Sequence, residues 1–176
     1  MKTPHSVSMP ATSGAPLCAP PAAPGPIFQS FCAQQHPPLS PDTEAVARRT
    51  VDALNTTTTS VDRPGMLLGL VQSGKTRTFV ATLAMALDQG FDIAVVLTKG
   101  TRALAAQTMA RLTRDLGAAL TRRVFLYDVM HLPANPTRFE LNQKLVLVAK
   151  KQTDNLDRLF EFLCEKHPHL SQKRIL

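Results

Sequence analysis

Eight residues in the middle of the chain constrain its fold more than any other feature. Residues 69–76 read Gly-Leu-Val-Gln-Ser-Gly-Lys-Thr and match the pattern G-x-x-x-x-G-K-[ST]. Glycines let the backbone turn tightly, so that successive N–H groups point at an anion, and a following helix directs the positive end of its dipole to the same place. The spacing therefore predicts a phosphate-binding loop between a strand and a helix. The alternative is a strand-to-helix turn that binds nothing.

Each position of this motif has an expected role. Lys75 reaches the β- and γ-phosphates of a nucleotide as a point charge, and the hydroxyl of Thr76 ligates Mg²⁺. The preceding small residues shape the loop. The candidate nucleotide-binding residues are Gly69, Gln72, Ser73, Gly74, Lys75 and Thr76, and Thr76 is also the candidate metal ligand.

Short apolar runs alternate with amphipathic segments along the chain. Continuous apolar runs such as 92–98 are typical of strands that are covered on both faces of a parallel sheet. Segments with apolar residues every three to four positions predict helices, and Gly90 and Gly117 are expected to end two of them. Strands are expected at 66–68, 92–98, 123–127 and 144–149, the start of a further strand at 174–176, and helices at 43–54, 75–89, 101–116 and 156–163. This alternation predicts an α/β fold with a mostly parallel sheet.

The first 41 residues have a different composition. Ten of the fourteen prolines fall between Pro4 and Pro41, and residues 3–41 contain no Asp, Glu, Lys or Arg. Prolines at this density break an apolar helix, so neither a signal peptide nor a membrane-spanning helix is expected. We therefore expect residues 1–41 to form a disordered Pro/Ala-rich tail and residues 42–176 to form the folded unit.

The net charge and the number of cysteines favour some classes of protein over others. Twenty Lys and Arg against thirteen Asp and Glu give a net charge of +7, which favours an anionic partner such as a nucleotide or a nucleic acid. The three cysteines form no C-x-x-C pair, so neither a disulfide scaffold nor a zinc ribbon is expected. These features predict a reducing, cytoplasmic location.

A P-loop protein that hydrolyses its nucleotide is expected to have a carboxylate in addition to the phosphate-binding loop. This acid stands at the end of an apolar strand and holds the water shell of Mg²⁺. Asp128, which follows the apolar run 124–127, is the one candidate of this form, since Asp92 precedes its strand. The chain contains no adjacent Asp-Glu pair. No catalytic residue is assigned from the sequence.

Residues 65–176 resemble the first part of the N-terminal RecA-like lobe of bacterial superfamily 2 DEAD/DEAH-box helicases. Three stretches carry the resemblance: 69–76 as motif I, 98–107 as motif Ia, and 144–153 as a later strand and turn. The resemblance implies a P-loop NTPase fold of RecA-like type with a doubly wound sheet, and ATP and Mg²⁺ as cofactors. It also implies that Thr101 and Arg102 lie near a nucleic-acid phosphate, with DNA favoured over RNA.

The resemblance stops before the acidic Walker B motif of that family and does not include its second lobe. It therefore implies an ATP-binding N-terminal fragment of a helicase-like, nucleic-acid-dependent ATPase, with a companion subunit as a source of the second lobe. Such a fragment is expected to bind ATP weakly and to hydrolyse almost none, since nothing orients the attacking water. The glutamine that reads adenine in such helicases has no assigned counterpart, although Gln34 and Gln35 lie upstream.

Two further interpretations stay open. The first is a small self-contained P-loop phosphotransferase or kinase, in which Asp128 is the acid on the metal side. The second is a non-catalytic product of a truncated gene.

Overall fold

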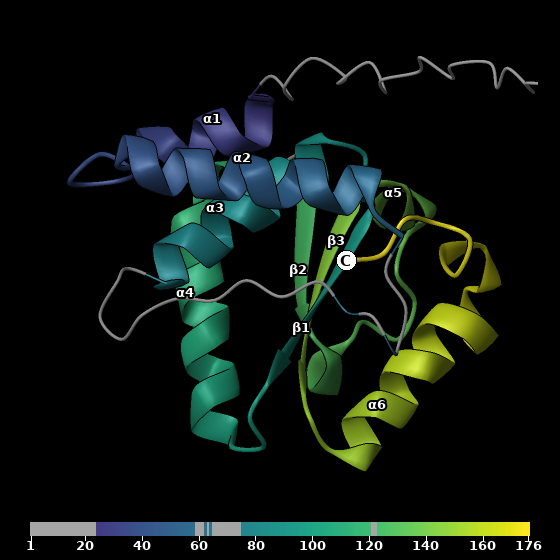
Figure 1. Ribbon diagram of the computed structural model, residues 1–176. Coiled ribbons are helices and arrows are strands. Elements are labelled where there is room, and N and C mark those ends of the chain that lie inside the picture. The colour runs from purple at the N-terminus through teal and green to yellow at the C-terminus, as the bar shows by residue number, and fades with distance from the viewer. Residues whose placement is uncertain (1–23, 59–61, 63, 65–74, 121–122) are drawn as a thin grey trace, which may run out of the picture.

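The computed structural model describes residues 24–58, 62, 64, 75–120 and 123–176 (Figure 1). Within these ranges, helices and strands follow one another in the order α1-α2-α3-β1-α4-β2-α5-β3-α6. The strand expected at 66–68, the motif residues Gly69, Gln72, Ser73 and Gly74, and the expected tail up to residue 23 lie outside them. None of the helices described is long and apolar enough to cross a membrane.

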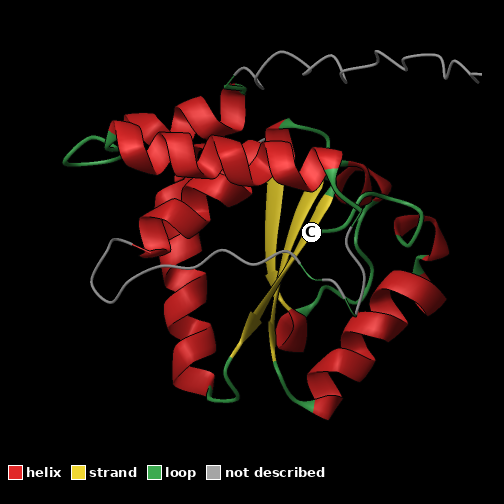
Figure 2. Ribbon diagram, in the orientation of Figure 1, coloured by secondary structure: helices red, strands yellow, loops and turns green. Residues whose placement is uncertain are grey.

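Three parallel strands form the centre of the molecule (Figure 2). β1 (Ile93–Thr98), β2 (Val124–Asp128) and β3 (Lys144–Lys150) lie in the order β1-β3-β2. Ile93 pairs with Leu145, and Val124 pairs with Lys144. Each of these strands lies within one residue of the bounds expected from its apolar run, so the expected α/β fold with a parallel sheet is confirmed. The finer assignment to the RecA-like P-loop NTPases stays a prediction.

The central strand sends its side chains alternately into two cores. Val146 and Val148 pack into the first core, whereas Leu145, Leu147 and Ala149 pack into the second, and all five are buried. The first core lies beneath α1 (Pro26–Ala33), α2 (Pro41–Thr56), α3 (Lys75–Asp88) and α4 (Arg102–Leu120). The second lies beneath α5 (Arg138–Asn142), α6 (Thr153–Phe160) and the short helical segments 129–131, 161–166 and 168–170. Burial on both faces explains why β3 is an uninterrupted apolar run.

The last three residues extend the sheet beside β1. Ile175 forms a parallel bridge with Ile93. The N–H of Leu176 donates to the carbonyl of Ile93 at 2.8 Å, and the N–H of Val95 donates to the carbonyl of Leu176 at 2.8 Å. The start of a strand expected at 174–176 is therefore confirmed as a short parallel pairing.

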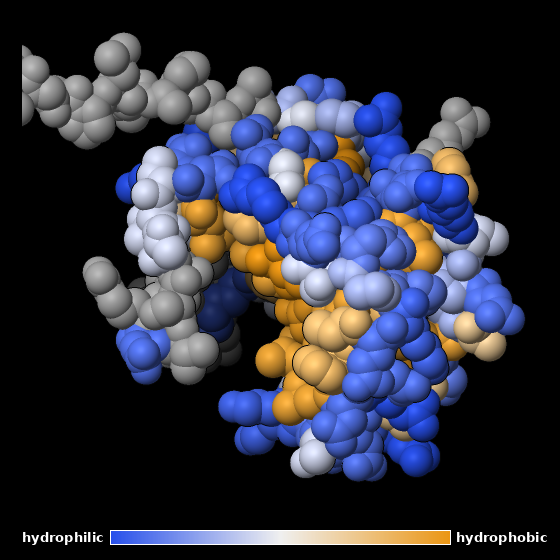
Figure 3. All heavy atoms as spheres, turned by 90° about the vertical axis from the view of Figure 1, so that its right-hand side faces the viewer, coloured by the Kyte–Doolittle hydropathy of each residue, from blue (hydrophilic) through white to orange (hydrophobic). Residues whose placement is uncertain are grey.

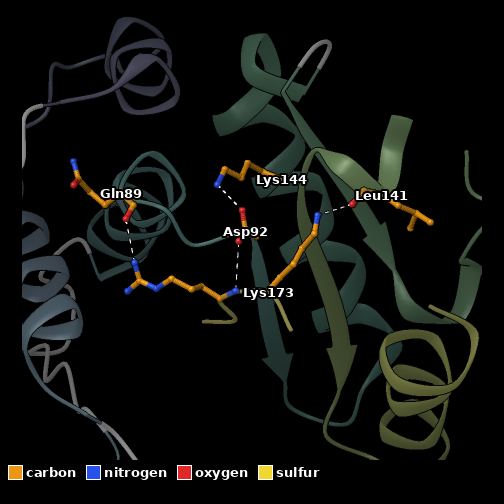
Figure 4. A network of polar contacts seen from close by, with 6 residues as sticks. Gln89, Asp92, Leu141, Lys144 and Lys173 are labelled. Carbon is orange, nitrogen blue, oxygen red and sulfur yellow. Dashed lines mark hydrogen bonds and ion pairs between the residues drawn. The ribbon is translucent and has the colours of Figure 1, made fainter. Parts of the chain in front are cut away.

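A polar network around Asp92 fixes this end of the sheet (Figure 4). The Nζ of Lys144 donates to one carboxylate oxygen of Asp92 at 2.9 Å, and the N–H of Arg174 donates to the other at 3.4 Å. The guanidinium of Arg174 reaches the carbonyl of Gln89 at 3.3 Å and lies 4.1 Å above the ring of Phe91. Burial acts to raise the pKa of Asp92, but these hydrogen bonds and the charge of Lys144 outweigh it and lower the pKa below its ordinary value of 3.8.

The expectation of a disordered tail through residue 41 is wrong for residues 26–41. Residues 26–33 form α1, which buries Ile27, Phe28 and Phe31 against α3 and α4. Pro26 occupies the first turn of α1, where its missing N–H costs nothing. The Pro-rich composition therefore did not reveal a short helix whose three large apolar side chains are each at most 3% exposed.

The expected boundary of α4 is also wrong. The helix continues through Gly117 to Leu120, because Gly117 sits inside the helix beside α1 rather than in a left-handed terminal position. Gly90, by contrast, has a φ of +94° directly after α3, which is the conformation expected of a helix-ending glycine.

The apolar face expected on α6 is displaced. Helical spacing predicts that Leu156 and Phe160 share an apolar face with Leu163, but they are 40% and 59% exposed, while Phe162 and Leu163 are buried. The helix widens to a π-helical turn over 161–166, after Leu156 and Phe160, and this turn contains the buried Phe162 and Leu163. Figure 3 shows one face of the molecule, on which apolar side chains lie exposed among hydrophilic ones.

Candidate functional site

The two described residues of the phosphate-binding motif lie at the start of α3, beside the carboxyl end of β1. Lys75 is the first residue of the helix and is exposed, and Thr76 is half-buried. Both line a pocket of about 400 Å³ between α3, α4 and β1, which we call the α3 pocket. The carboxyl end of a parallel sheet is where ligands bind in open α/β folds.

Three elements supply the walls of the α3 pocket. Its remaining lining residues are Phe79 and Val80 of α3, Val96, Leu97, Thr98 and Lys99 at the end of β1, and Leu104, Gln107, Thr108, Arg111 and Leu112 of α4. Phe79, Leu97 and Leu104 are 38%, 52% and 38% exposed, so each presents apolar surface to the pocket. Helical spacing predicts that Phe79 shares an apolar face with Val80 and Leu83, but unlike them it is not buried in the core.

The charges that line the α3 pocket have a single sign. Lys75, Lys99 and Arg111 are cations, and no Asp or Glu is among the described residues that line the pocket. Since like charges gathered in a cleft raise the local concentration of oppositely charged ligands, the pocket attracts anions.

Arg111 contacts the motif directly. Its Nη1 donates to the Oγ1 of Thr76 at 2.9 Å. Arg111 is half-buried on α4, and the next residue along the helix, Leu112, is 1% exposed in the first core. The packed helix therefore holds the guanidinium at the start of α3. Sequence reasoning missed this residue because the resemblance to motif Ia ends at Gln107, one helical turn earlier.

The candidate metal ligand Thr76 lies beside a cation in the part of the chain that the structure describes. The hydroxyl of Thr76 faces a guanidinium, whereas Mg²⁺ is bound mainly through carboxylates, waters and phosphate oxygens. Within the described ranges, no group of three or more His, Cys, Asp or Glu side chains is placed to hold a metal ion. The described residues of the α3 pocket thus suit an anion better than a divalent cation.

A buried contact fixes the first turn of α3 from the other side. The Nε of Arg77 donates to the side-chain oxygen of Gln35 at 3.2 Å, and a second guanidinium nitrogen donates to the carbonyl of Pro37. Gln35 is only 8% exposed. This glutamine, to which no role was given from the sequence, links the segment between α1 and α2 to the helix that begins with Lys75.

The residues expected near nucleic acid lie at the start of α4. The Oγ1 of Thr101 accepts the N–H of Leu104 at 3.3 Å, so Thr101 caps the helix as its sequence position predicts. The side chain of Gln152 donates to the carbonyl of Gly100 at 2.8 Å and ties the preceding turn to the end of β3. Thr101 and Arg102 are both exposed.

Arg102 lines a second pocket, of about 340 Å³, which we call the β2 pocket. Its other lining residues are Ala105, Ala106, Asp128, Met130, His131 and Lys150. One side of α4 therefore lines the α3 pocket, and the opposite side lines the β2 pocket.

Asp128 belongs to the β2 pocket and is not among the residues that line the α3 pocket. One of its carboxylate oxygens accepts the N–H of Met130 at 2.9 Å, and the other lies 3.5 Å from Nδ1 of His131. The carboxylate thus caps the helical turn that follows β2. The structure does not bring it together with Lys75 and Thr76.

No family model, no curated protein and no solved structure matches the chain.

Proposed function

We propose that this chain binds ATP, with the phosphates held at the α3 pocket. The observation that carries the proposal is the placement of three basic side chains, Lys75, Lys99 and Arg111, around a pocket with no acidic residue among its described lining. The pocket lies at the start of a 14-residue helix, whose dipole favours a phosphate group. Lys75 and Thr76 are the last two residues of a motif whose spacing independently predicts phosphate binding.

The apolar part of the α3 pocket favours a nucleotide over a bare phosphate. Phe79, Leu97 and Leu104 expose apolar surface within the same cavity as the three cations. A ligand that carries both a base and a polyphosphate can contact both kinds of surface, whereas inorganic phosphate uses only the cations.

We further propose that ATP binding serves a nucleic-acid-dependent, helicase-like ATPase of which this chain forms the N-terminal part. This step rests on the resemblance of residues 69–76 and 98–107 to helicase motifs I and Ia. The position of Arg102 supports it, because Arg102 and Lys150 line the β2 pocket, where these two cations outnumber the carboxylate of Asp128 and suit a nucleic-acid phosphate. A second lobe from a companion subunit would be required for turnover. A phosphotransferase with Asp128 as its acid gains no support, since Asp128 caps a helical turn in the other pocket.

Calorimetry on the purified 176-residue protein tests the first proposal. We expect ATP to bind, and Lys75→Ala to weaken binding at least about tenfold, because it removes a charged contact to phosphate. Lys151→Ala is the matched control, since Lys151 is exposed and lines neither pocket. Equal affinity in all three proteins, or no heat from the folded wild type, would overturn the proposal.

Fluorescence anisotropy with labelled single-stranded DNA and RNA tests the second. We expect DNA to bind with an affinity that falls as salt rises, and Arg102→Ala to weaken it by severalfold. Binding that is insensitive both to salt and to this substitution would rule out the assigned contact.

A further inference from the structure

Arg111 is the cation in the α3 pocket that no sequence motif explains. It donates to Thr76 Oγ1 at 2.9 Å, and it forms no ion pair with a carboxylate in the ranges that the structure describes. The hydroxyl that it contacts is the one that the motif assigns to Mg²⁺. The motif therefore assigns one cation to this oxygen atom, whereas the structure places a different one beside it.

We propose that Arg111 is a phosphate-binding residue that replaces the metal ion beside Thr76, so that the chain binds nucleotide polyphosphate without a divalent cation. This inference deepens the proposed function and rests on it, because it concerns the same pocket. The ligand class that it names is the metal-free nucleotide, in which the phosphate oxygens carry their full negative charge.

The first argument is electrostatic. Mg²⁺ lies about 2.1 Å from its oxygen ligands. An ion bound to Thr76 Oγ1 would therefore sit within a few ångströms of the guanidinium that donates to the same atom. The repulsion between these charges opposes metal binding, and no described acid of the pocket offsets it. Arginine stays charged at any pH that proteins tolerate, so deprotonation does not relieve the conflict.

The second argument concerns the donors that remain. A guanidinium has five N–H groups in a planar arrangement, and within the described ranges the contact with Thr76 uses one nitrogen of Arg111. Its other donors can contact phosphate oxygens in the pocket that Arg111 lines. A guanidinium thus supplies charge and directed hydrogen bonds at the position where a metal ion would supply charge and octahedral coordination.

The third argument is that Arg111 is positioned before any ligand arrives. Leu112 and Leu116, the next apolar residues of α4, are each 1% exposed in the first core. The helix is therefore fixed relative to α3, and the hydrogen bond to Thr76 orients the half-buried side chain. Little conformational entropy is left to lose when phosphate binds.

Calorimetry with ATP in EDTA and in excess Mg²⁺ tests the inference on the full chain. The variants are Arg111→Gln and, as a control, Arg114→Gln, which removes the same charge from the same helix and does not line the pocket, although it also removes the ion pair with Asp115. For wild type we expect the two Kd values to agree within about threefold. For Arg111→Gln we expect the Kd in EDTA to rise about tenfold or more and to recover partly in Mg²⁺, because the metal can then reach Thr76.

Each outcome separates this inference from the proposed function. If wild type binds ATP only with Mg²⁺, or if Arg111→Gln behaves like Arg114→Gln in EDTA, the inference fails while nucleotide binding stands. If no protein binds ATP under either condition, the proposed function itself fails. Circular dichroism melting curves of each variant identify any loss of binding that comes from unfolding.

Discussion

The carboxylate of Asp88 at the end of α3 holds the first turn of α1, and a single methyl group at Gly25 is expected to displace it. Asp88 accepts the N–H of Ile27 at 3.1 Å and the N–H of Phe28 at 2.8 Å, so it caps α1 from a distant part of the chain. A Cβ added at Gly25 would lie 2.6 Å from Oδ1 and 2.7 Å from Cβ of Asp88. These separations are far below van der Waals contact, so Gly25→Ala must push the carboxylate away.

The expected cost follows from what the carboxylate does. Gly25 has φ −87° and ψ −178°, which alanine adopts without strain, so the backbone itself contributes little. The loss is that of two charge-assisted hydrogen bonds at a helix N-terminus, which is about 2 kcal/mol in the free energy of unfolding. For a domain of this size, that corresponds to a fall of about 4–8 °C in Tm.

Urea denaturation of a double-mutant cycle measures this effect. We expect Gly25→Ala and Asp88→Ala each to cost about 2 kcal/mol, and the double variant to cost about 2 rather than about 4 kcal/mol, because both substitutions remove the same contact. Gly117→Ala is the control, since a Cβ there meets only Gln34 at an ordinary 3.5 Å inside α4 and is expected to stabilise by up to about 1 kcal/mol.

Strictly additive costs in this cycle would refute the reasoning, because they would mean that the alanine methyl and the Asp88 carboxylate do not compete for space. A Gly25→Ala variant as stable as wild type would do the same. Either result would also mean that the Asp88 carboxylate at the end of α3 does not hold α1 in place.

Three further predictions concern pH and the first turn of α3. The pKa of Asp92 is lowered in the folded protein, so its contribution to stability is complete above the ordinary value of 3.8 and is lost as pH falls through the folded pKa. We expect Lys144→Gln to reduce this loss of unfolding free energy at acidic pH, as measured by urea titrations. Burial, together with the charges of His169 and Lys166, lowers the pKa of His167. Stability should therefore decline as pH falls below about 6.5, and His167→Gln should flatten the decline. Arg77→Ala leaves the buried Gln35 without its guanidinium partner, and should cost about 1–2 kcal/mol in unfolding and weaken ATP binding severalfold.

Each of these three has an outcome that contradicts it. If the unfolding free energy of Lys144→Gln falls at acidic pH as steeply as that of wild type, the ion pair with Asp92 does not persist in solution. A wild-type unfolding free energy that does not change between pH 7 and pH 5 would contradict the prediction for His167. An Arg77→Ala protein with wild-type stability and affinity would show that the first turn of α3 is fixed by other contacts.

The strands could be predicted closely from the sequence because both faces of the sheet are covered. Five consecutive buried residues in β3 leave a pattern that no surface segment shows. The start of α4 could also be predicted, because Thr101 caps it through its own side chain. These are local signals, and they depend on a few neighbouring residues.

Features that depend on tertiary packing could not be predicted in the same way. α1 is a short helix whose cap, Asp88, lies 60 residues away, so nothing in its own Pro-rich sequence marks it apart from Pro26 and the spacing of Ile27, Phe28 and Phe31. Arg111 lies 35 residues from Thr76, and only the packing of α4 against α3 brings the two together.

The shared helix between the two pockets has a thermodynamic consequence. α4 presents Leu104, Thr108 and Arg111 to one cavity, and Arg102, Ala105 and Ala106 to the other. Any ligand that shifts this helix on one side alters the cavity on the other side, and linkage makes the coupling free energy identical in both directions. If a ligand in the α3 pocket changes the affinity of the β2 pocket for its own ligand by some factor, a ligand in the β2 pocket changes the affinity of the α3 pocket by the same factor.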